Sequence, residues 1–370
     1  MLKVQEYLKT NTLAQLTEEL GIKAKVYEED NLVLLDYDQI NSPKMHPIVI
    51  ECRSLILALD TFDVVSRKFD RFFNLGEAPE LYEDFDFENA VVMEKADGSL
   101  IGIYHNPYTS RWEISTRGMA KAEGEHMAGG VFRDKVLAAA GFVDEGEFQL
   151  YASEKFSKTD TYIFEYCSPE NRIVTKYDDP HLVLTAIRDI YGEEANAFTL
   201  NWCEICLRDL RVRSVKTYDA KKPEELRELA NALPNLEEGF VVWCEKTSRR
   251  IKVKSSTYLV AHKLRGNDPK PTRKNMMSLV LEGEVDEFLA YFPEWQEQVD
   301  AAQQEVNVFC DVMLITYTQN MHIENQKEFA LAIKDVPGNS LMFTARKSNM
   351  SIPAVFHSLD LHRKLRLFGL

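Results

Sequence analysis

Long apolar runs, internal repeats and low-complexity tracts are all missing from this sequence. No window of its 370 residues approaches the roughly 18 consecutive apolar residues that a membrane helix requires. The opening residues carry Lys3, Glu6 and Lys9 and contain no apolar core of a signal peptide. We therefore predict a globular protein that has no membrane contact and works in the cytoplasm.

Cysteine is scarce, and histidine forms no cluster. The six cysteines are mostly far apart in a large chain, which is typical of reduced thiols and not of a disulfide framework. Cys203 and Cys206 form a single CxxC pair, without a second pair or a histidine at zinc-finger spacing. A buried helix explains this pair better than a zinc site.

Positive charge is in deficit over the whole chain. Lysine and arginine number 44 against 59 acidic residues, and the resulting net charge of -15 repels nucleic acid on average. The segment 246–274 is the exception, because it holds ten basic residues and only Asp268 as an acidic one. Such runs are more often solvated surface than binding site, and both interpretations stay open.

The patterning predicts two domains. From residue 29 to residue 259, short runs rich in Val, Ile, Phe and Tyr alternate with turn residues, which indicates an α+β domain that leans toward antiparallel sheets. After residue 258, apolar residues from Trp295 to Met313 recur every three or four positions, as in a helix, and Phe329–Ile333 is a second helical stretch. The predicted strands cover residues 31–37, 47–59, 91–94, 100–104, 162–166, 240–244 and 250–254. We expect domains over 1–258 and 259–370, joined by a Gly- and Pro-rich linker at 265–272.

The segment 95–99, Lys-Ala-Asp-Gly-Ser, is the first candidate for chemistry. Predicted strands flank it, and Asp97-Gly98 is a turn signal, so Lys95 is expected where a strand enters a hairpin turn. A lysine attacks an electrophile only as the neutral amine, which nearby cations or desolvation favour. By itself, a Lys-x-Asp-Gly also occurs by chance in plain surface hairpins.

The run 250–254, Arg-Ile-Lys-Val-Lys, supplies such cations. The two-residue period of a strand puts Ile251 and Val253 on one face and Lys252 and Lys254 on the other. Two ammonium groups that point together bind a phosphate and favour the neutral form of a neighbouring lysine. The alternative is an edge strand whose lysines face water.

Two glutamates complete the candidate set. Glu165 is a charge inside the apolar strand 162–166, and such a charge is rarely buried without a partner. Glu238 precedes Gly239 and an apolar run, at the start of a strand. Carboxylates at such positions bind ribose hydroxyls, magnesium or a catalytic lysine, although the neighbouring Glu237 could equally belong to a solvated loop.

Four of these segments resemble motifs I, III, IV and V of the covalent nucleotidyltransferases, which include DNA ligases, RNA ligases and mRNA capping enzymes. In chain order, they are 95–99, 164–166, 238–239 and 252–254. More specifically, the chain resembles the bacteriophage RNA ligase 1 family, ATP-dependent enzymes that seal broken tRNA. The matching stretches are 51–53, 71–75, 94–100, 164–165, 171–174, 238–239 and 251–255. The helical C-terminal region is similar in position and character. The resemblance implies a nucleotidyltransferase domain of antiparallel sheets flanked by helices, followed by an all-helical domain for RNA or tRNA specificity.

The resemblance also implies a three-step reaction and a role for each matched residue. Lys95 would take AMP from ATP, pass it to the 5′-phosphate of an RNA end, and a 3′-hydroxyl would then displace AMP. The implied catalytic residues are Lys95, Glu165, Glu238 and Arg117. The implied nucleotide contacts are Tyr37, Arg53, Arg71, Lys95, Glu165, Val241, Lys252 and Lys254. Arg71 and Arg117 stand where the family has lysines, which keeps the charge and changes the geometry.

The implied metal is magnesium or manganese, bound by Glu238 and by Asp286, for which a helix-surface position is the alternative. The implied partner is RNA with 3′-hydroxyl and 5′-phosphate ends, and tRNA is the expected substrate. The resemblance further implies a monomer that seals these ends after a polynucleotide kinase or phosphatase has prepared them. If a phage encodes the chain, its compartment is the host cytoplasm. Cations of the helical domain are expected to contact the RNA backbone, namely Lys263, Arg265, Arg273, Lys274, Arg363 and Lys364.

Two other functions remain open at this stage. A DNA ligase or a capping enzyme shares the four motifs, but both usually follow motif V with an oligonucleotide-binding β-barrel, whereas helices are predicted here. An RNA-binding protein without catalysis would use the basic segment for phosphates. The intact Lys95, Lys252 and Lys254 argue against that alternative.

Overall fold

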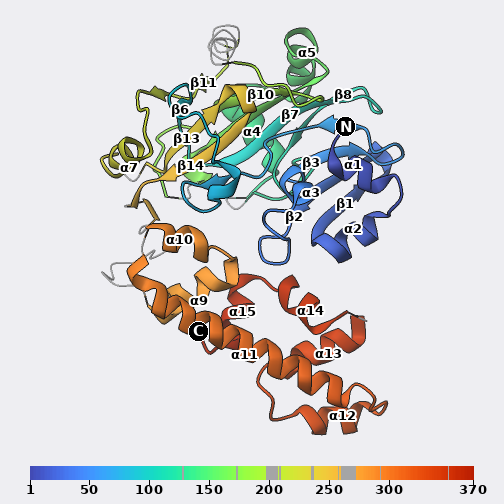
Figure 1. Ribbon diagram of the computed structural model, residues 1–370. Helices are drawn as coiled ribbons and strands as arrows, with labels where there is room; N and C mark the ends of the chain where they lie inside the picture. The colour runs from blue at the N-terminus through green and yellow to red at the C-terminus, as the bar shows by residue number, and fades with distance from the viewer. Residues whose placement is uncertain are drawn as a thin grey trace. The chain divides into compact units, whose positions relative to one another are not determined.

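The computed structural model describes the chain except for a few short segments. Those segments are residues 127–128, 172–173, 197–206, 208–209, 235–236, 257, 260–271, 292 and 349. The chain divides into two compact units, 1–262 and 263–370. Sheets and helices build the first unit, and helices build the described part of the second (Figure 1). The predicted α+β class is confirmed, while Cys203, Cys206 and nearly all of the predicted linker lie outside the described residues. No described helix has the length and apolar character of a membrane span.

The N-terminal part of the first unit is a four-stranded antiparallel sheet with helices on one face. Its strands follow the order β1-β2-β3-β4. Their bounds are β1 Ile22–Tyr27, β2 Leu32–Tyr37, β3 Leu55–Ala58 and β4 Val64–Ser66, and the covering helices are α1 Lys3–Leu8, α2 Leu13–Leu20 and α3 Pro47–Glu51. Val4, Leu16, Val33 and Leu57 are among the buried residues that hold these layers together.

The strand predicted over 47–59 is wrong in its first half. Pro47–Glu51 is helix α3, with Pro47 in the first turn, where its fixed φ suits a helix and its missing N–H is not needed. Ile48 and Val49 turn into the N-terminal core. Only the second half of the predicted strand extends, as β3.

The second sheet has the strand order β11-β10-β9-β7-β8, in which only β10 and β11 are parallel. Its strands are β7 Ser99–Asn106, β8 Arg111–Ser115, β9 Asp160–Cys167, β10 His181–Asp189 and β11 Val212–Ser214. Helices α4 (Phe132–Ala140) and α5 (Glu145–Lys155) cover one face. Ile101 and Phe164 lie in the core beneath these helices, so the neighbouring residues of β7 and β9 face the other way.

The third sheet has the strand order β12-β6-β13-β14-β5. Its strands are β5 Phe73–Asn74, β6 Val91–Glu94, β12 Thr217–Tyr218, β13 Gly239–Cys244 and β14 Arg249–Lys254, and helix α7 (Pro223–Asn231) packs on one face. Ile251 and Val253 are buried on the α7 side. Lys252 and Lys254 therefore project from the opposite face, as the strand period predicted.

The hairpin predicted around Asp97-Gly98 is also wrong, because β6 and β7 belong to different sheets. Asp97 is only 2% exposed, and its carboxylate accepts hydrogen bonds from the Val174 and Thr175 backbone N–H groups and from the Tyr258 hydroxyl. At Gly98 a Cβ would lie 2.2 Å from the Tyr166 carbonyl oxygen. The segment after Lys95 is thus a buried crossing between two sheets and not a surface turn.

The second unit is a cluster of helices. Their bounds are α9 Arg273–Glu282, α10 Val285–Tyr291, α11 Gln296–Asn320, α12 Gln326–Ile333, α13 Asn339–Ser348, α14 Ile352–Ser358 and α15 Leu361–Leu367. The apolar stripe predicted from Trp295 onward is confirmed, since α11 buries Val299, Ala302, Val306 and Met313. The second predicted helical stretch is α12, which buries Phe329 and Ile333.

Candidate active site

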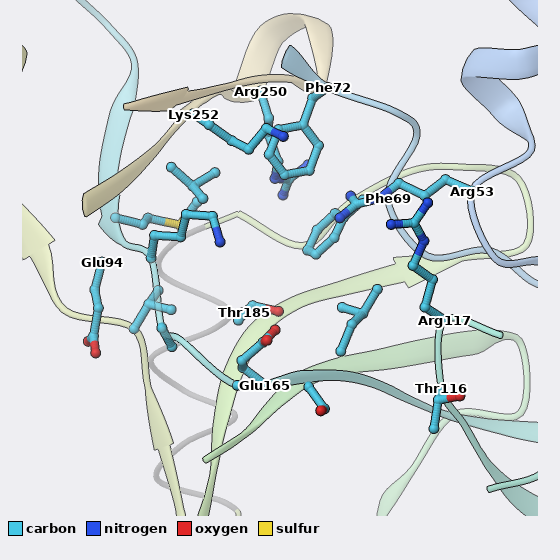
Figure 2. Close-up of a pocket in the computed structure, with 18 of the residues that line it drawn as sticks. Arg53, Phe69, Phe72, Glu94, Thr116, Arg117, Glu165, Thr185, Arg250 and Lys252 are labelled. Atoms are coloured by element: carbon cyan, nitrogen blue, oxygen red, sulfur yellow. The ribbon is translucent and has the colours of Figure 1, made fainter. Parts of the chain in front are cut away.

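A cavity of about 510 Å³ lies between the second and third sheets of the first unit. Residues from the inner faces of both sheets line it, including Glu165 and Thr185 from one and Lys252 from the other. In Figure 2, Lys252 and Phe72 lie across the cavity from Glu165 and Thr185. The helices cover the outer faces, so the polar inner faces are left for a ligand.

Backbone pairing brings three of the predicted residues together. The Lys95 N–H donates to the Gly239 carbonyl at 2.9 Å, and Gly239 is paired with Lys254 between β13 and β14. Gly239 has φ +136°, and a Cβ there would lie 2.0 Å from the Val253 carbonyl oxygen, so only glycine fits this crossing point. The end of β6, the start of β13 and the end of β14 therefore meet at one place.

Glu238 holds both lysines at that place. Its Oε2 lies 2.6 Å from Lys95 Nζ, and its Oε1 lies 3.3 Å from Lys254 Nζ. Glu238 is 5% exposed, whereas the Lys95 side chain is 22% exposed and lines the cavity. The candidate nucleophile and a candidate phosphate-binding cation thus share one carboxylate. We call Lys95, Glu238, Lys252 and Lys254 the strand-end wall.

An apolar strip continues this wall. Met93, Val241 and Lys252 form one row across β6, β13 and β14, and all three line the cavity. Val215 lines it as well. A flat apolar group such as an adenine ring fits against such a strip, with Lys252 beside it.

Glu165 faces the cavity from β9, between Leu100 of β7 and Val183 of β10. Burial raises the pKa of Glu165 to about 8, and the neighbouring Lys95 opposes that rise. Near neutral pH this carboxyl therefore carries a proton for much of the time, and a protonated carboxyl both donates and accepts hydrogen bonds. A pair of sugar hydroxyls is a suitable partner for it.

The other side of the cavity consists of arginines packed on aromatic rings. Arg53 lies 4.7 Å from the Phe72 ring centroid and 5.9 Å from that of Phe69. Lys252 approaches the Phe72 ring at 5.4 Å. Arg53 Nη1 is buried and has no hydrogen-bond partner among the described residues. We call Arg53, Phe69, Phe72 and Arg117 the arginine wall, and its unsatisfied donor suits an anion.

Tyr37 is buried behind that wall and does not line the cavity. Its ring lies between Arg71, at 4.1 Å, and Arg117, at 4.7 Å. Arg117 donates to Asp36 at 3.1 Å and lines the cavity, as Arg53 does. Arg71 lines an adjoining cavity of about 480 Å³, which shares Phe69 and Phe72 with the first. The predicted catalytic residue Arg117 therefore reaches the main cavity, whereas the predicted nucleotide contacts Tyr37 and Arg71 do not line it.

The predicted metal ligands are not clustered. Among the described residues, no group of three or more His, Cys, Asp or Glu side chains could hold an ion. Glu238 and Glu165 both act on Lys95 at the cavity. Hydrated magnesium needs only one or two carboxylates besides substrate phosphates, so Glu238 beside the reacting lysine still fits such an ion. Asp286 lies on α10 of the second unit, outside the residues that line the cavity, and its role stays a prediction.

The predicted RNA contacts of the second unit separate into exposed and buried residues. Lys274 on α9 and Arg363 on α15 are exposed, while Arg273 pairs with Glu305. Lys364 is buried against the Phe356 ring, so the expectation that it contacts RNA is wrong. Lys263 and Arg265 lie outside the described residues.

Sequence reasoning missed several residues around the cavity. Phe69 lies between the guanidinium groups of Arg53 and Arg250, and Arg250 is itself paired with the buried Glu194. Lys68 is buried directly behind Arg53 and Arg117. The only available signal was the alternation of basic and aromatic residues in 67–73, which by itself does not indicate burial.

Comparison with known proteins gives a consistent result. A family model described as RNA ligase matches residues 51–265. A putative bifunctional polynucleotide kinase/RNA ligase of Autographa californica nuclear polyhedrosis virus is 34% identical over 379 residues, which cover 99% of this chain and 53% of that protein. An RNA ligase of Rhodothermus phage RM378 is 25% identical over 359 residues, which cover 80% of each protein. The chain thus spans about half the length of the viral relative.

Solved structures give weaker similarities. An RNA ligase of Naegleria gruberi matches with a TM-score of 0.43 and 17% identity, over 54% of this chain and 58% of that one. An archaeal ATP-dependent RNA ligase matches with a TM-score of 0.44 and 14% identity, over 81% of this chain and 78% of that one.

Proposed function

Because the chain belongs to the phage RNA ligase 1 family, whose model matches residues 51–265, we propose that it is an ATP-dependent RNA ligase. In this proposal, Lys95 becomes covalently linked to AMP. The observation that carries it is the shared carboxylate, with Glu238 within 2.6 Å of Lys95 Nζ and within 3.3 Å of Lys254 Nζ. A nucleophile and a cation for the reacting phosphate thus line one cavity, and the buried carboxylate that orients the nucleophile is paired with both.

In the first step, Lys95 Nζ attacks the α-phosphorus of ATP. A nitrogen–phosphorus bond forms, the bond to the pyrophosphate oxygen breaks, and the amine loses its proton. Glu238 orients the amine, and Lys252 and Lys254 stabilise the charge that develops on the α-phosphate oxygens. Arg53 and Arg117 would hold the departing phosphates from the other wall.

The nucleoside is proposed to lie across the inner faces of both sheets. Val241 and Met93 would contact the adenine, and Glu165 would bind the ribose hydroxyls. A magnesium or manganese ion, when bound, would neutralise phosphate charge, and Glu238 is the residue we propose to hold its water shell. Tyr37 and Arg71 would act on the triphosphate through Arg117 and from the adjoining cavity.

The later steps join the RNA ends. AMP passes from Lys95 to an oxygen of the RNA 5′-phosphate, and the nitrogen–phosphorus bond breaks. The 3′-hydroxyl of the other end then attacks the 5′-phosphorus, and AMP leaves with the oxygen that linked it. Each step is a displacement at phosphorus, in which positioning and charge neutralisation supply most of the rate.

The direct test of the first step is a covalent label. With ATP labelled at its α-phosphate and magnesium, we expect the wild type to retain label after denaturation and Lys95→Ala to retain none. Lys121→Ala is the matched control, because Lys121 pairs with Asp30 at 3.3 Å and does not line the cavity. An unlabelled wild type would favour the RNA-binding protein, and a label from GTP but not from ATP would favour a capping enzyme.

We further propose that the helical domain, from about residue 259 to 370, binds RNA, with cleaved tRNA as the natural substrate. The exposed Lys274 and Arg363 lie on α9 and α15, which pack against each other. Reversing both charges should weaken sealing of cleaved tRNA more than sealing of a short oligonucleotide, and should leave self-adenylation intact. Equal loss on both RNAs would contradict this assignment. A DNA strand sealed as fast as RNA would favour a DNA ligase.

The state of the RNA ends suggests a partner activity. The viral relative is named a putative bifunctional polynucleotide kinase/RNA ligase, and a ligase of this kind needs a 5′-phosphate and a 3′-hydroxyl. We propose that a polynucleotide kinase or phosphatase prepares these ends, and that the ligase works on them as a monomer in the cytoplasm. Sealing of ends that carry a 5′-hydroxyl should therefore require added kinase.

A further inference from the structure

Lys68 is a buried lysine that none of the roles above uses. It follows β4 and is 1% exposed. Its Nζ donates to Ser115 Oγ at 2.8 Å and to the Ser54 carbonyl at 3.2 Å. Room for its stem exists because position 102 is glycine: a Cβ there would lie 2.9 Å from both Lys68 Cδ and Ser115 Oγ. The lysine therefore occupies a site that several strands build together.

The two acceptors of Lys68 adjoin the arginine wall. Ser54 follows Arg53, and Ser115 precedes Thr116 and Arg117, which line the cavity. Ser54 Oγ also donates to the Thr116 carbonyl at 2.9 Å, so the two segments are tied to each other as well as to the lysine. One ammonium group thus connects the backbone beside Arg53 with the backbone beside Arg117.

The charge around Lys68 is poorly compensated. Both of its hydrogen-bond acceptors are neutral. Asp36 of β2 favours the ammonium, but that carboxylate is already paired with Arg117 at 3.1 Å, and Arg53 opposes the ammonium. From β7 and β8, the contacting groups are the uncharged Gly102 and Ser115. Burial therefore lowers the pKa of Lys68 to about 7, and its charge changes within the neutral range.

We propose that Lys68 is a positioning residue that takes up a proton when the phosphates of a nucleotide bind, and that its ammonium then holds Arg53 and Arg117 toward them. This inference rests on the proposed function, because it requires phosphates at the arginine wall. The negative charge of the ligand favours the ammonium, and by linkage the protonated lysine favours the ligand. The proton comes from solvent, and no bond of the nucleotide is broken.

The test is proton uptake on binding. The probe is an ATP analogue with a methylene bridge between the α- and β-phosphorus, which cannot transfer AMP, titrated calorimetrically with magnesium in two buffers of different ionisation enthalpy. We expect the wild type to take up nearly one proton more than Lys68→Met at about pH 8. Above pH 7, the affinity of the wild type should fall by up to about tenfold per pH unit, with a flatter profile in the variant. Lys121→Met, at an ion-paired lysine outside the cavity, should match the wild type.

Each outcome separates this inference from the proposed function. If the wild type binds the analogue and Lys68→Met shows the same proton uptake and pH profile, the role of Lys68 is wrong and the ligase proposal stands. If the wild type binds no analogue between pH 6 and pH 9, the ligase proposal itself fails. Should Lys68→Met not fold, Ser115→Ala gives the second measurement. Loss of that acceptor should move the largest proton uptake to lower pH, and an unchanged profile would overturn the inference.

Discussion

The strand-end wall of the cavity is positioned by backbone hydrogen bonds, whereas the arginine wall is positioned by side chains packed on one another. The pairing of β13 with β14 and of Lys95 with Gly239 brings Lys95, Glu238 and Lys254 to one place. Arg53 is instead held by two aromatic rings. Covalent chemistry needs fixed geometry, while a departing phosphate chain needs charge that can adjust. The difference predicts that equivalent substitutions will have unequal effects on the two walls.

The largest effect on stability is expected when one methyl group is added at a glycine that adjoins each wall. Gly239→Ala places a Cβ 2.0 Å from the Val253 carbonyl oxygen, whereas a Cβ at Gly118 meets nothing within 4 Å. The first change should lower the free energy of unfolding by about 2–5 kcal/mol and abolish self-adenylation. Gly118→Ala should leave stability unchanged. Chemical denaturation of both variants checks this, and equal stabilities would show that register does not control the strand-end wall.

The next effect concerns the carboxylate that the two lysines share. Glu238→Gln keeps the shape but removes the charge, and should slow self-adenylation by ~10²-fold or more, because the nucleophile loses its orienting partner. Single-turnover measurements at saturating ATP isolate this step. Glu237→Gln, at the neighbouring residue, whose charge acts on Tyr218, is the control and should remain active. A fast Glu238→Gln enzyme would mean that backbone pairing alone positions Lys95.

Three features of the cavity show how much of its structure can be predicted from the sequence. Strand periodicity correctly placed Lys252 and Lys254 on one face, because that pattern is local. The hairpin prediction at Asp97-Gly98 is wrong, because the acceptor role of Asp97 depends on Val174 and Tyr258, far away in the chain. The burial of Lys68 cannot be predicted from the local sequence, since it depends on Gly102 and two distant serines.

A smaller effect should appear in the pH dependence of stability. The pKa of Glu165 is raised to about 8 by burial, so between its unfolded value of 4.5 and pH 8 the native state keeps a proton that the unfolded state releases. The stabilisation is complete below about pH 4.5 and is lost as the pH rises through 8. The free energy of unfolding of Glu165→Gln, relative to that of the wild type, should therefore increase by about 2–3 kcal/mol between pH 5 and pH 8. Parallel stability profiles would contradict the buried, protonated carboxyl.

The smallest effect is expected on the arginine wall. Phe72→Leu removes the ring that lies under Arg53 and beside Lys252, and should weaken ATP binding by about three- to tenfold. The transfer rate at saturating ATP should stay close to that of the wild type, because the strand-end wall is intact. If Phe72→Leu lowered the transfer rate as much as Glu238→Gln does, the arginine wall would control the covalent step as strongly as the strand-end wall does.

The central claim is that the sheet register makes Lys95, and not its neighbours, the nucleophile. It is tested most directly by incubating the wild type with ATP and magnesium, digesting it, and locating the adenylyl group by mass spectrometry. We expect one modified peptide, with AMP on the side chain of Lys95. Modification of Lys252 or Lys254 in its place, or of no lysine at all, would contradict it.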